Sequence, residues 1–410
     1  MVDTTLLQQK SSTSHRINDP ASANIKSSAN RSLTPFTFQG QKDTKDLGLP
    51  WSAPFPLALS ATTITTIPDA ITTIRTLRET GDLRTLANHH AGAILIRGLP
   101  IKSPLDYSQV AHALGLQPHV EVGRPPLRTV LAPNVKTANE GPPELPIWPH
   151  NEYGWSTINP AWLTFSALEV PEKGGATPIT SSIYIAKKLE QRVPVFLEEL
   201  RKRGAMYTYR YTTETLVSNT GNSIRGAYGE HVEDGDDEET FRRKVEAEVR
   251  RHSERFEWHA DGSLSVTHVV PAIRIHNPTG LTIFFGNITS AWGRSRYHGA
   301  TRPPFQGDDG SYHPPPQFGD ETPMDVNDLD TLLDIAEEGA VNVEWEQGDL
   351  VIIDNYAVQH SRQPWVGERR VLAALWDDEA EGRVGDFPEG LELLKQAPRV
   401  PIVEDTELEK

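Results

Sequence analysis

The chain has 410 residues, a formal charge of −16 at pH 7 and no cysteine. The length allows one elaborated domain or two ordinary ones. The acidic balance argues against a nucleic-acid or anionic-membrane surface, because phosphate binding requires clustered lysines and arginines. The absence of cysteine excludes disulfides, thiolate metal sites and cysteine nucleophiles, so any metal ion must be held by nitrogen and oxygen ligands. This composition favours a protein that acts on small molecules.

Residues 1–46 are rich in Ser, Thr, Asn, Gln and Lys and hold few large apolar side chains. Such a composition cannot offset the entropy of ordering, so we expect a disordered or loosely packed arm. No signal peptide follows Met1 and no stretch of about 20 apolar residues could span a membrane, which favours the cytoplasm. An organelle-transit segment is the alternative, because basic residues are scattered among the serines of the arm: Lys10, Arg16, Lys26 and Arg31.

Residues 47–410 are expected to form one domain. A helix is predicted from Asp69, a possible cap, because apolar residues then recur on one helical face. A buried strand over 93–99 and a second helix over 105–114 follow. Two further helical patterns occupy an insert at about 183–253, on either side of an acidic turn.

Short strand patterns then crowd the rest of the chain, separated by Gly, Pro and Asp turns: FEWHA, LSVTHVVPAIRI, LTIFFG, VNVEW, DLVIID and RVLAALW. Many short strands predict a β-sandwich or barrel core with helices packed outside. Residues 300–325 show no periodicity over a length unusual for a connection. We expect this segment to be either a lid or disordered.

The segment IWPHNEYGW, residues 147–155, sets His150 and Glu152 two apart among aromatic side chains. A carboxylate removed from water is costly unless it is paired or bound to a metal. In an extended segment, residues two apart point the same way, so both side chains could reach one ion. At this point an equal alternative is that the histidine and the glutamate form hydrogen bonds in the core or at its rim and bind no metal.

The pattern His-x-acid is weak evidence by itself. Fourteen histidines and 56 acidic residues in a chain of 410 give about two such pairs by chance, and the sequence has five. Three of these pairs are predicted to lie on the surface. His231 falls in the acidic run, His252 ends a basic helix, and His259 precedes an Asp-Gly turn.

A third ligand is offered by His360, in GDLVIIDNYAVQHSRQPWVGERR. A buried strand ends at Asp354, the chain turns, and a second strand begins at Arg369 and Arg370. Two histidines and one carboxylate leave three positions of an iron ion open, which is the arrangement of non-haem Fe(II) oxygenases. An arginine at the start of the second strand could bind the far carboxylate of a diacid cosubstrate.

Several blocks together resemble the taurine dioxygenase and clavaminate synthase-like family of Fe(II), 2-oxoglutarate-dependent oxygenases. The likeness covers roughly residues 92–377, with blocks in this order: GAILIRGLP, TANEGPPELPIWPHNEY, VPEKGGATPITSS, PAIRIHNPTGLTIFFGN and GDLVIIDNYAVQHSRQPWVGERR. It implies a mainly β fold with flanking helices around a double-stranded β-helix, or jelly-roll, core. It also implies Fe(II), 2-oxoglutarate as cosubstrate, and O2.

The resemblance implies that His150, Glu152 and His360 are the iron ligands and the catalytic residues. Many members carry Asp where this chain has Glu152, and Glu occurs in the clavaminate synthase-like branch. Because a carboxylate is present, a halide cannot easily take that iron position, and halogenation is not expected. Thr177, in GGATP, matches a threonine that helps to bind 2-oxoglutarate. The simpler alternative for Thr177 is an ordinary turn hydroxyl.

Arg370 matches the arginine that pairs with the distal carboxylate of 2-oxoglutarate. The alternative is an exposed strand residue paired with Glu368. Arg369 takes the role if the register differs by one, since alternate strand residues face opposite ways. Taurine-type members carry a second arginine four residues further on for the sulfonate, whereas this chain has Ala374, which argues against a sulfonate substrate.

The resemblance implies oxidation of a C–H bond of a small molecule in biosynthesis. Its Glu branch includes enzymes of amino acids and their derivatives, and one fungal member closes an aziridine ring on valine. We therefore expect hydroxylation, desaturation or ring closure of a free or modified amino acid. Asn139, Val343 and Trp345 are candidate substrate-binding residues. A turn role for Asn139 and a core role for the other two are equally compatible with the sequence.

A zinc hydrolase or a catalytically silent metal-binding β-barrel with the same three ligands is the competing interpretation, since zinc accepts them. Thr177 and Arg370 would have no role in a hydrolase. We expect a small-molecule substrate, and neither nucleic acid nor a membrane as partner. The sequence does not fix the oligomeric state, and a homodimer is compatible with it.

Overall fold

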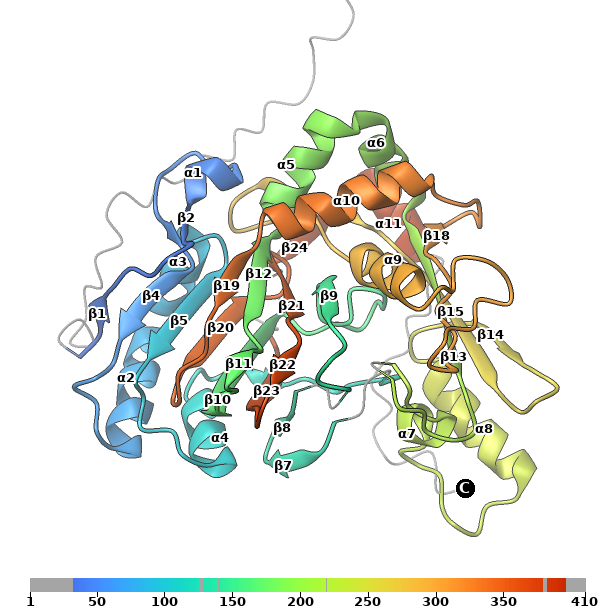
Figure 1. Ribbon diagram of the computed structural model, residues 1–410, viewed down its shortest axis with the longest axis horizontal. Helices are drawn as coiled ribbons and strands as arrows, with labels where there is room; N and C mark the ends of the chain where they lie inside the picture. Colours follow the sequence, from blue (N-terminus) through green and yellow to red (C-terminus); the bar gives the residue numbers. More distant parts are fainter. Residues whose placement is uncertain (1–31, 125–127, 139–140, 219, 379–381, 396–410) are drawn as a thin grey trace, which may run out of the picture.

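The computed structural model of the chain describes residues 32–124, 128–138, 141–218, 220–378 and 382–395. Figure 1 shows sheets in the middle of the molecule with helices around them, as the strand patterns predicted. The predicted arm is shorter than expected, because residues 32–46 are folded: Leu33 is 1% exposed, and β1 (Thr34–Pro35) pairs with β4 (Leu57–Ser60). The remainder of the arm, residues 1–31, lies outside the described residues.

A 9-stranded sheet runs through the molecule in the order β1-β4-β5-β20-β10-β23-β8-β7, with β6 on β23. Its other strands are β5 (Ala93–Arg97), β20 (Leu350–Asp354), β10 (Trp162–Glu169), β23 (Arg370–Asp377), β8 (Val135–Thr137), β7 (Val130–Ala132) and β6 (Gln117–Pro118). Alternate residues of the central strands belong to two separate cores. In β23, for example, Val371 and Ala373 join one core, and Leu372 and Ala374 join the other. Both faces of this sheet are therefore covered.

Three helices cover the outer face: α2 (Ile67–Glu79), α3 (Asp82–His89) and α4 (Pro104–His112). The helix predicted from Asp69 begins two residues earlier. Its cap is Thr66, whose side chain accepts a hydrogen bond from the Asp69 amide, so Asp69 lies in the first turn and is not the cap. An acidic residue in a first turn still interacts favourably with the helix dipole.

A 4-stranded sheet packs against the inner face in the order β19-β12-β21-β9. Its strands are β19 (Val341–Val343), β12 (Thr177–Ser181), β21 (Val358–Arg362) and β9 (Ile147–His150). Pairing is antiparallel throughout, with Thr177 opposite Val343 and His360 opposite His150. This short sheet therefore brings candidate residues from four distant parts of the sequence together.

The insert predicted as helical contains a strand as well. Its helices are α5 (Ser182–Arg192), α6 (Pro194–Arg203), α7 (Ile224–Tyr228) and α8 (Glu238–Val249), and β13 (Ala205–Tyr211) runs between them. The strand belongs to a second 4-stranded sheet, in the order β14-β15-β13-β18: β14 (Arg255–Trp258), β15 (Leu264–Val270) and β18 (Gln317–Phe318). Because β18 lies within 300–325, that segment is tied to the insert and is not disordered.

The remaining elements complete the fold (Figure 1). They are α1 (Thr44–Leu47), β2 (Lys42–Asp43), β3 (Pro54–Phe55), β11 (Lys173–Gly174), β16 (Ile273–His276), β17 (Leu281–Phe284), α9 (Ile288–Tyr297), α10 (Val326–Glu338), β22 (Trp365–Val366), β24 (Val384–Asp386) and α11 (Pro388–Lys395). Every strand pattern predicted after the insert corresponds to a strand. Across the described ranges, no helix is both long and apolar enough to cross a bilayer.

Candidate metal centre

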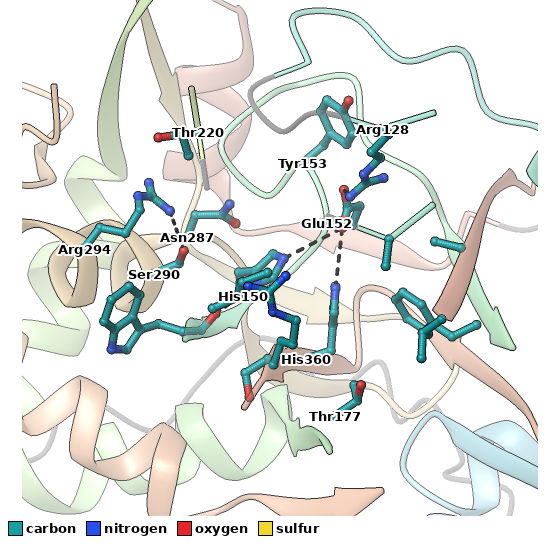
Figure 2. A pocket seen from close by; sticks show the side chains of 18 of the residues that line it. Arg128, His150, Glu152, Tyr153, Thr177, Thr220, Asn287, Ser290, Arg294 and His360 are labelled. Atoms are coloured by element: carbon teal, nitrogen blue, oxygen red, sulfur yellow. Dashed lines mark hydrogen bonds and ion pairs between the residues drawn. The ribbon is translucent and has the colours of Figure 1, made fainter. Parts of the chain in front are cut away.

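Two side chains from neighbouring strands and one from the turn after the first strand converge on one point (Figure 2). His150, at the end of β9, and His360, in β21, are opposed residues of an antiparallel pair, and their ring centroids lie 4.2 Å apart. The Glu152 Oε2 atom lies 3.8 Å from His150 Nε2 and 3.5 Å from His360 Nε2. Each residue offers a ligand atom within 4.8 Å of the others. The sheet register thus brings together the three residues that the sequence singled out.

Both imidazoles are prepared to act as neutral ligands. The Nδ1 atom of His150 lies 2.9 Å from the Trp148 carbonyl oxygen, so this nitrogen donates its proton and Nε2 keeps its lone pair. Burial, with His150 nearby, lowers the pKa of His360 to about 4. A neutral imidazole is the form that binds a metal ion.

Glu152 is ionised although it is only 5% exposed. Burial alone would raise its pKa, but the Arg128 guanidinium, with smaller contributions from the neighbouring His150 and His360, holds the pKa well below its usual value. Arg128 Nη2 donates to Glu152 Oε1 over 2.6 Å. Oε2 is therefore the oxygen that faces the two imidazoles. Two neutral nitrogens and one carboxylate oxygen fit Fe(II) with open positions.

The backbone of Glu152 is fixed by a neighbouring side chain. Asn355, at the end of β20, accepts from the Glu152 amide over 2.8 Å and donates to the Glu152 carbonyl over 2.9 Å. The next residue, Tyr153, has φ of 53°, an uncommon conformation for a side chain of this size. The chain therefore turns sharply after the ligand, and Asn355 holds that turn in place.

Arg128 belongs to a second layer of charges behind the carboxylate. Its Nη1 lies 3.5 Å from Glu121 Oε1, which also accepts from the Tyr153 hydroxyl over 2.9 Å. Lys136 pairs with the other Glu121 oxygen. Sequence reasoning missed Arg128, because a single arginine far upstream of His150 carries no pattern.

The metal centre opens into a cavity of about 910 Å³, a volume that includes solvent at its mouth. Thr177 lines this cavity, and its hydroxyl accepts from Trp345 Nε1 over 3.1 Å. Trp345 and Val343 are buried in the core and do not line the cavity, so the expectation that they contact substrate is wrong. Val343 and Trp345 do lie on the same face of VNVEW, as the alternation predicted, but that face packs against the apolar core and not against the cavity. Asn139 lies outside the described residues.

The structure corrects the choice of arginine on β23. Arg369, Val371 and Ala373 line the cavity, because alternate residues of a strand share a face. Arg369 donates to the Gly175 carbonyl over 3.0 Å and lies 3.5 Å from the Thr177 hydroxyl. Arg370 is exposed and lies on the other face of the strand, away from the cavity, which agrees with the alternative that it is an exposed strand residue. Arg369 is thus the arginine beside Thr177.

Polar side chains form the opposite wall of the cavity. Asn287 precedes α9, Ser290 and Arg294 belong to it, and Tyr209 comes from β13. Arg294 Nη1 donates to Ser290 Oγ over 2.7 Å. Within the described ranges, no carboxylate pairs with Arg294. Sequence reasoning missed all four, because Tyr209, Ser290 and Arg294 lie outside the blocks that carry the resemblance, and Asn287 ends one of these blocks without a pattern of its own.

One of the remaining His-x-acid pairs was interpreted wrongly. His252 is 2% exposed, and its ring packs against Trp155, Tyr228 and His268. His231 lies 3.4 Å from Glu248 with a partly exposed side chain. His252 is therefore a core histidine, although it ends a helix of charged residues.

Comparison with known proteins gives the family. Residues 69–376 match the family described as "Taurine catabolism dioxygenase TauD, TfdA family", over more than half of the chain. The chain belongs to the TauD/TfdA dioxygenase family. The enzymes of this family are Fe(II)- and 2-oxoglutarate-dependent dioxygenases that act on small molecules with O2. This chain is accordingly a TauD/TfdA dioxygenase, and the zinc hydrolase interpretation is set aside.

Two curated relatives of this TauD/TfdA dioxygenase cover most of its length. A clavaminate synthase-like protein of Arabidopsis thaliana is 30% identical over 292 residues, 70% of this chain and 82% of the relative. The dapdiamide synthesis protein DdaC of Enterobacter agglomerans is 25% identical over 291 residues, with the same coverage of both chains. Among solved structures, PvcB of Pseudomonas aeruginosa is similar with a TM-score of 0.43 and 15% identity, over 87% of this chain and 94% of PvcB.

Proposed function

We propose that this dioxygenase oxidises a C–H bond of a free or modified amino acid, with hydroxylation, desaturation or ring closure as the outcome. His150, Glu152 and His360 bind Fe(II), and Arg369 and Thr177 bind 2-oxoglutarate. The observation that carries the proposal is that both groups of residues line one cavity. A jelly-roll core is part of the proposal, supported by two sheets that face each other across one apolar core.

Bound Fe(II), with 2-oxoglutarate and O2, supplies an oxidant strong enough to remove hydrogen from carbon. The protein positions the reactants and excludes water. Arg128 engages one Glu152 oxygen and leaves the other for the metal. Phe165, Val371 and Ala373 add an apolar wall to the same cavity, which keeps bulk water from the reacting groups.

Exchange of the two neighbouring arginines tests the cosubstrate site. Arg369→Gln is expected to raise the KM for 2-oxoglutarate by about 30-fold or more, because a buried, charge-assisted pair with a carboxylate is lost. Arg370→Gln is the matched control and should leave this KM within about twofold, since surface substitutions have small effects. Succinate release at varied 2-oxoglutarate concentration measures both. The opposite ranking of the two variants would show that Arg370 binds the cosubstrate.

The substrate class rests on the opposite wall. Arg294 lies in the cavity with its Nε buried and without a hydrogen-bond partner among the described residues. A buried guanidinium edge without an acceptor favours an anionic ligand such as a carboxylate. Ala373 takes the cavity position four residues after Arg369, so that site offers no second arginine for a sulfonate. A curated relative named for dapdiamide synthesis agrees with a biosynthetic role.

Arg294→Met tests this carboxylate site. It is expected to raise the KM for the amino acid that best stimulates succinate release by about tenfold or more, while the KM for 2-oxoglutarate stays unchanged. Arg296→Met, two residues along α9 and exposed, is the control. A panel of free amino acids and their methyl esters provides the readout. If the substitution raised the KM equally for the free acids and for their methyl esters, Arg294 would not recognise a carboxylate. The assignment of the metal centre would remain as it is.

A further inference from the structure

A second cluster of metal-ligand side chains lies outside the catalytic cavity. His298 follows α9 directly, and Asp309 and His313 lie in the segment 300–325. Each offers a ligand atom within 4.8 Å of the others. The side chains are 3%, 9% and 1% exposed, respectively. None of the three lines the catalytic cavity, so the cluster needs an explanation of its own.

The hydrogen bonding of His298 leaves a lone pair directed into the cluster. Its Nδ1 lies 2.6 Å from Asp308 Oδ1 and donates to that carboxylate. The Nε2 atom then faces Asp309 Oδ2 at 3.8 Å, beyond hydrogen-bond distance, so a space is left between a ring nitrogen and a carboxylate oxygen. Such an arrangement calls for a cation. A carboxylate behind the outer nitrogen of a histidine is also the usual support of a metal-binding imidazole.

His313 completes the donor set. Its Nε2 lies 3.0 Å from both oxygens of Asp309, and its ring stacks on that of His298 with centroids 4.6 Å apart. The second Asp309 oxygen, Oδ1, accepts from the Ser311 amide over 3.0 Å. Oδ2 faces both imidazoles and is therefore the oxygen that an ion between them would bind.

The loop closes over the cluster at a glycine. A Cβ on Gly307 would lie 2.8 Å from His298 Cβ and 2.9 Å from both Asp309 Oδ1 and His313 Cδ2. Contacts of this kind essentially never occur, so a side chain at 307 would push the cluster apart. The Gly307 amide also donates to the Ser311 carbonyl over 2.8 Å. The backbone is thus shaped around these three side chains.

We propose that His298, Asp309 and His313 bind one zinc ion that fixes the loop 307–313 to the end of α9. Two imidazoles and a carboxylate are zinc ligands, and water completes such a coordination shell. The site bears on the active site through the same helix, because Arg294 of α9 and His313 border one narrow cleft with Tyr312. The zinc is structural, and the proposal does not depend on the substrate or the reaction at the catalytic centre.

Metal uptake by the complete protein tests the site. The double variant His150→Ala, His360→Ala removes the catalytic ligands, and metal-free protein of this kind is titrated with Co2+ and then with Zn2+. We expect one equivalent of Co2+ to bind, with the visible absorption of a low-coordinate site, and to be displaced by Zn2+. A rise in Tm with Zn2+ is expected as well, because an ion that binds only the folded chain stabilises it.

The same titration in a background that also carries Asp309→Asn or His313→Asn should show no uptake and no rise in Tm. His259→Asn, which replaces a partly buried histidine whose ring lies 2.7 Å from the Ser265 hydroxyl, is the matched control and should bind as before. Absence of Co2+ and Zn2+ binding in the double variant, with folding verified by circular dichroism, would overturn the proposal. The cluster would then be held by a protonated His298 between two carboxylates.

Discussion

His360→Ala is expected to lower succinate release from 2-oxoglutarate more than about 100-fold and to abolish stoichiometric Fe(II) binding. Loss even of a residue that only supports a metal ligand costs about 10- to 100-fold, and loss of a ligand costs more. The pair of opposed strands gives no substitute, because the residue across from His360 is His150, which is itself a ligand. Anaerobic iron binding and succinate release measure the two effects.

His259→Ala is the control for the loss of a histidine, since its ring forms a hydrogen bond with Ser265 and is not among the described residues that line the cavity. It should keep full iron binding and turnover. The alternative of a misfolded variant is distinguished by Tm, which should fall little for His360→Ala. Undiminished turnover of His360→Ala would exclude this residue as an iron ligand.

Asp354→Ala is expected to destabilise the fold by about 3–5 kcal/mol, because removal of one partner leaves a buried charge without compensation. Asp354 and Arg383 are fully buried, and Asp354 Oδ2 accepts from Arg383 Nε and from His276 Nε2, both over 2.9 Å. The guanidinium of Arg383 also stacks 4.3 Å above the ring of Trp162. Urea unfolding of the two proteins at pH 7 measures the difference in free energy of unfolding.

The same pair predicts how stability depends on pH. Burial by itself would raise the pKa of Asp354, but Arg383 and His276 outweigh burial and hold the pKa far below its usual value. A depressed pKa contributes stability above the unfolded value of about 4, and this contribution is lost as the pH falls below it. The difference in free energy of unfolding between the wild type and Asp354→Asn should therefore become smaller from pH 6 to pH 3. A difference that stays constant over this range would show that Asp354 is not charged in the folded protein.

Much of the metal centre followed from sequence, for a physical reason. His150 ends a strand, and Glu152 lies in the turn directly after it, so their nearness in sequence keeps them together although the segment is not extended as the alternation argument assumed. The third ligand comes with a strand of its own. The strands after the insert were also predicted, because short apolar runs between Gly, Pro and Asp turns have few other structures. The strand β13 was missed, because AMYTYRY is a single short run between two helical patterns, although Gly204 marks the end of the first helix.

The residues around the centre could not be predicted in the same way. Arg369 and Arg370 are adjacent, and only the register of β23 decides which of them faces the cavity. Arg128 and Arg294 reach the cavity from segments far from the metal ligands, and a single arginine has no periodicity. Trp345 was predicted to lie near the site, which is correct, but it does not line the cavity; its indole Nε1 donates a hydrogen bond to the Thr177 hydroxyl from the core side. Each of these depends on tertiary packing, which no local pattern encodes.

Four arginines and one glutamate line the catalytic cavity: Arg128, Arg294, Arg362, Arg369 and Glu152. Burial, and to a smaller extent the nearby Arg369, lowers the pKa of Arg362 to about 9. A divalent metal ion adds to the excess of positive charge in the cavity, and the dianion 2-oxoglutarate reduces it. The metal ion and 2-oxoglutarate should therefore bind with positive cooperativity. Although the chain carries a net charge of −16, the cavity is thus expected to attract anions. Anions of the assay buffer should therefore compete with 2-oxoglutarate for binding in the cavity.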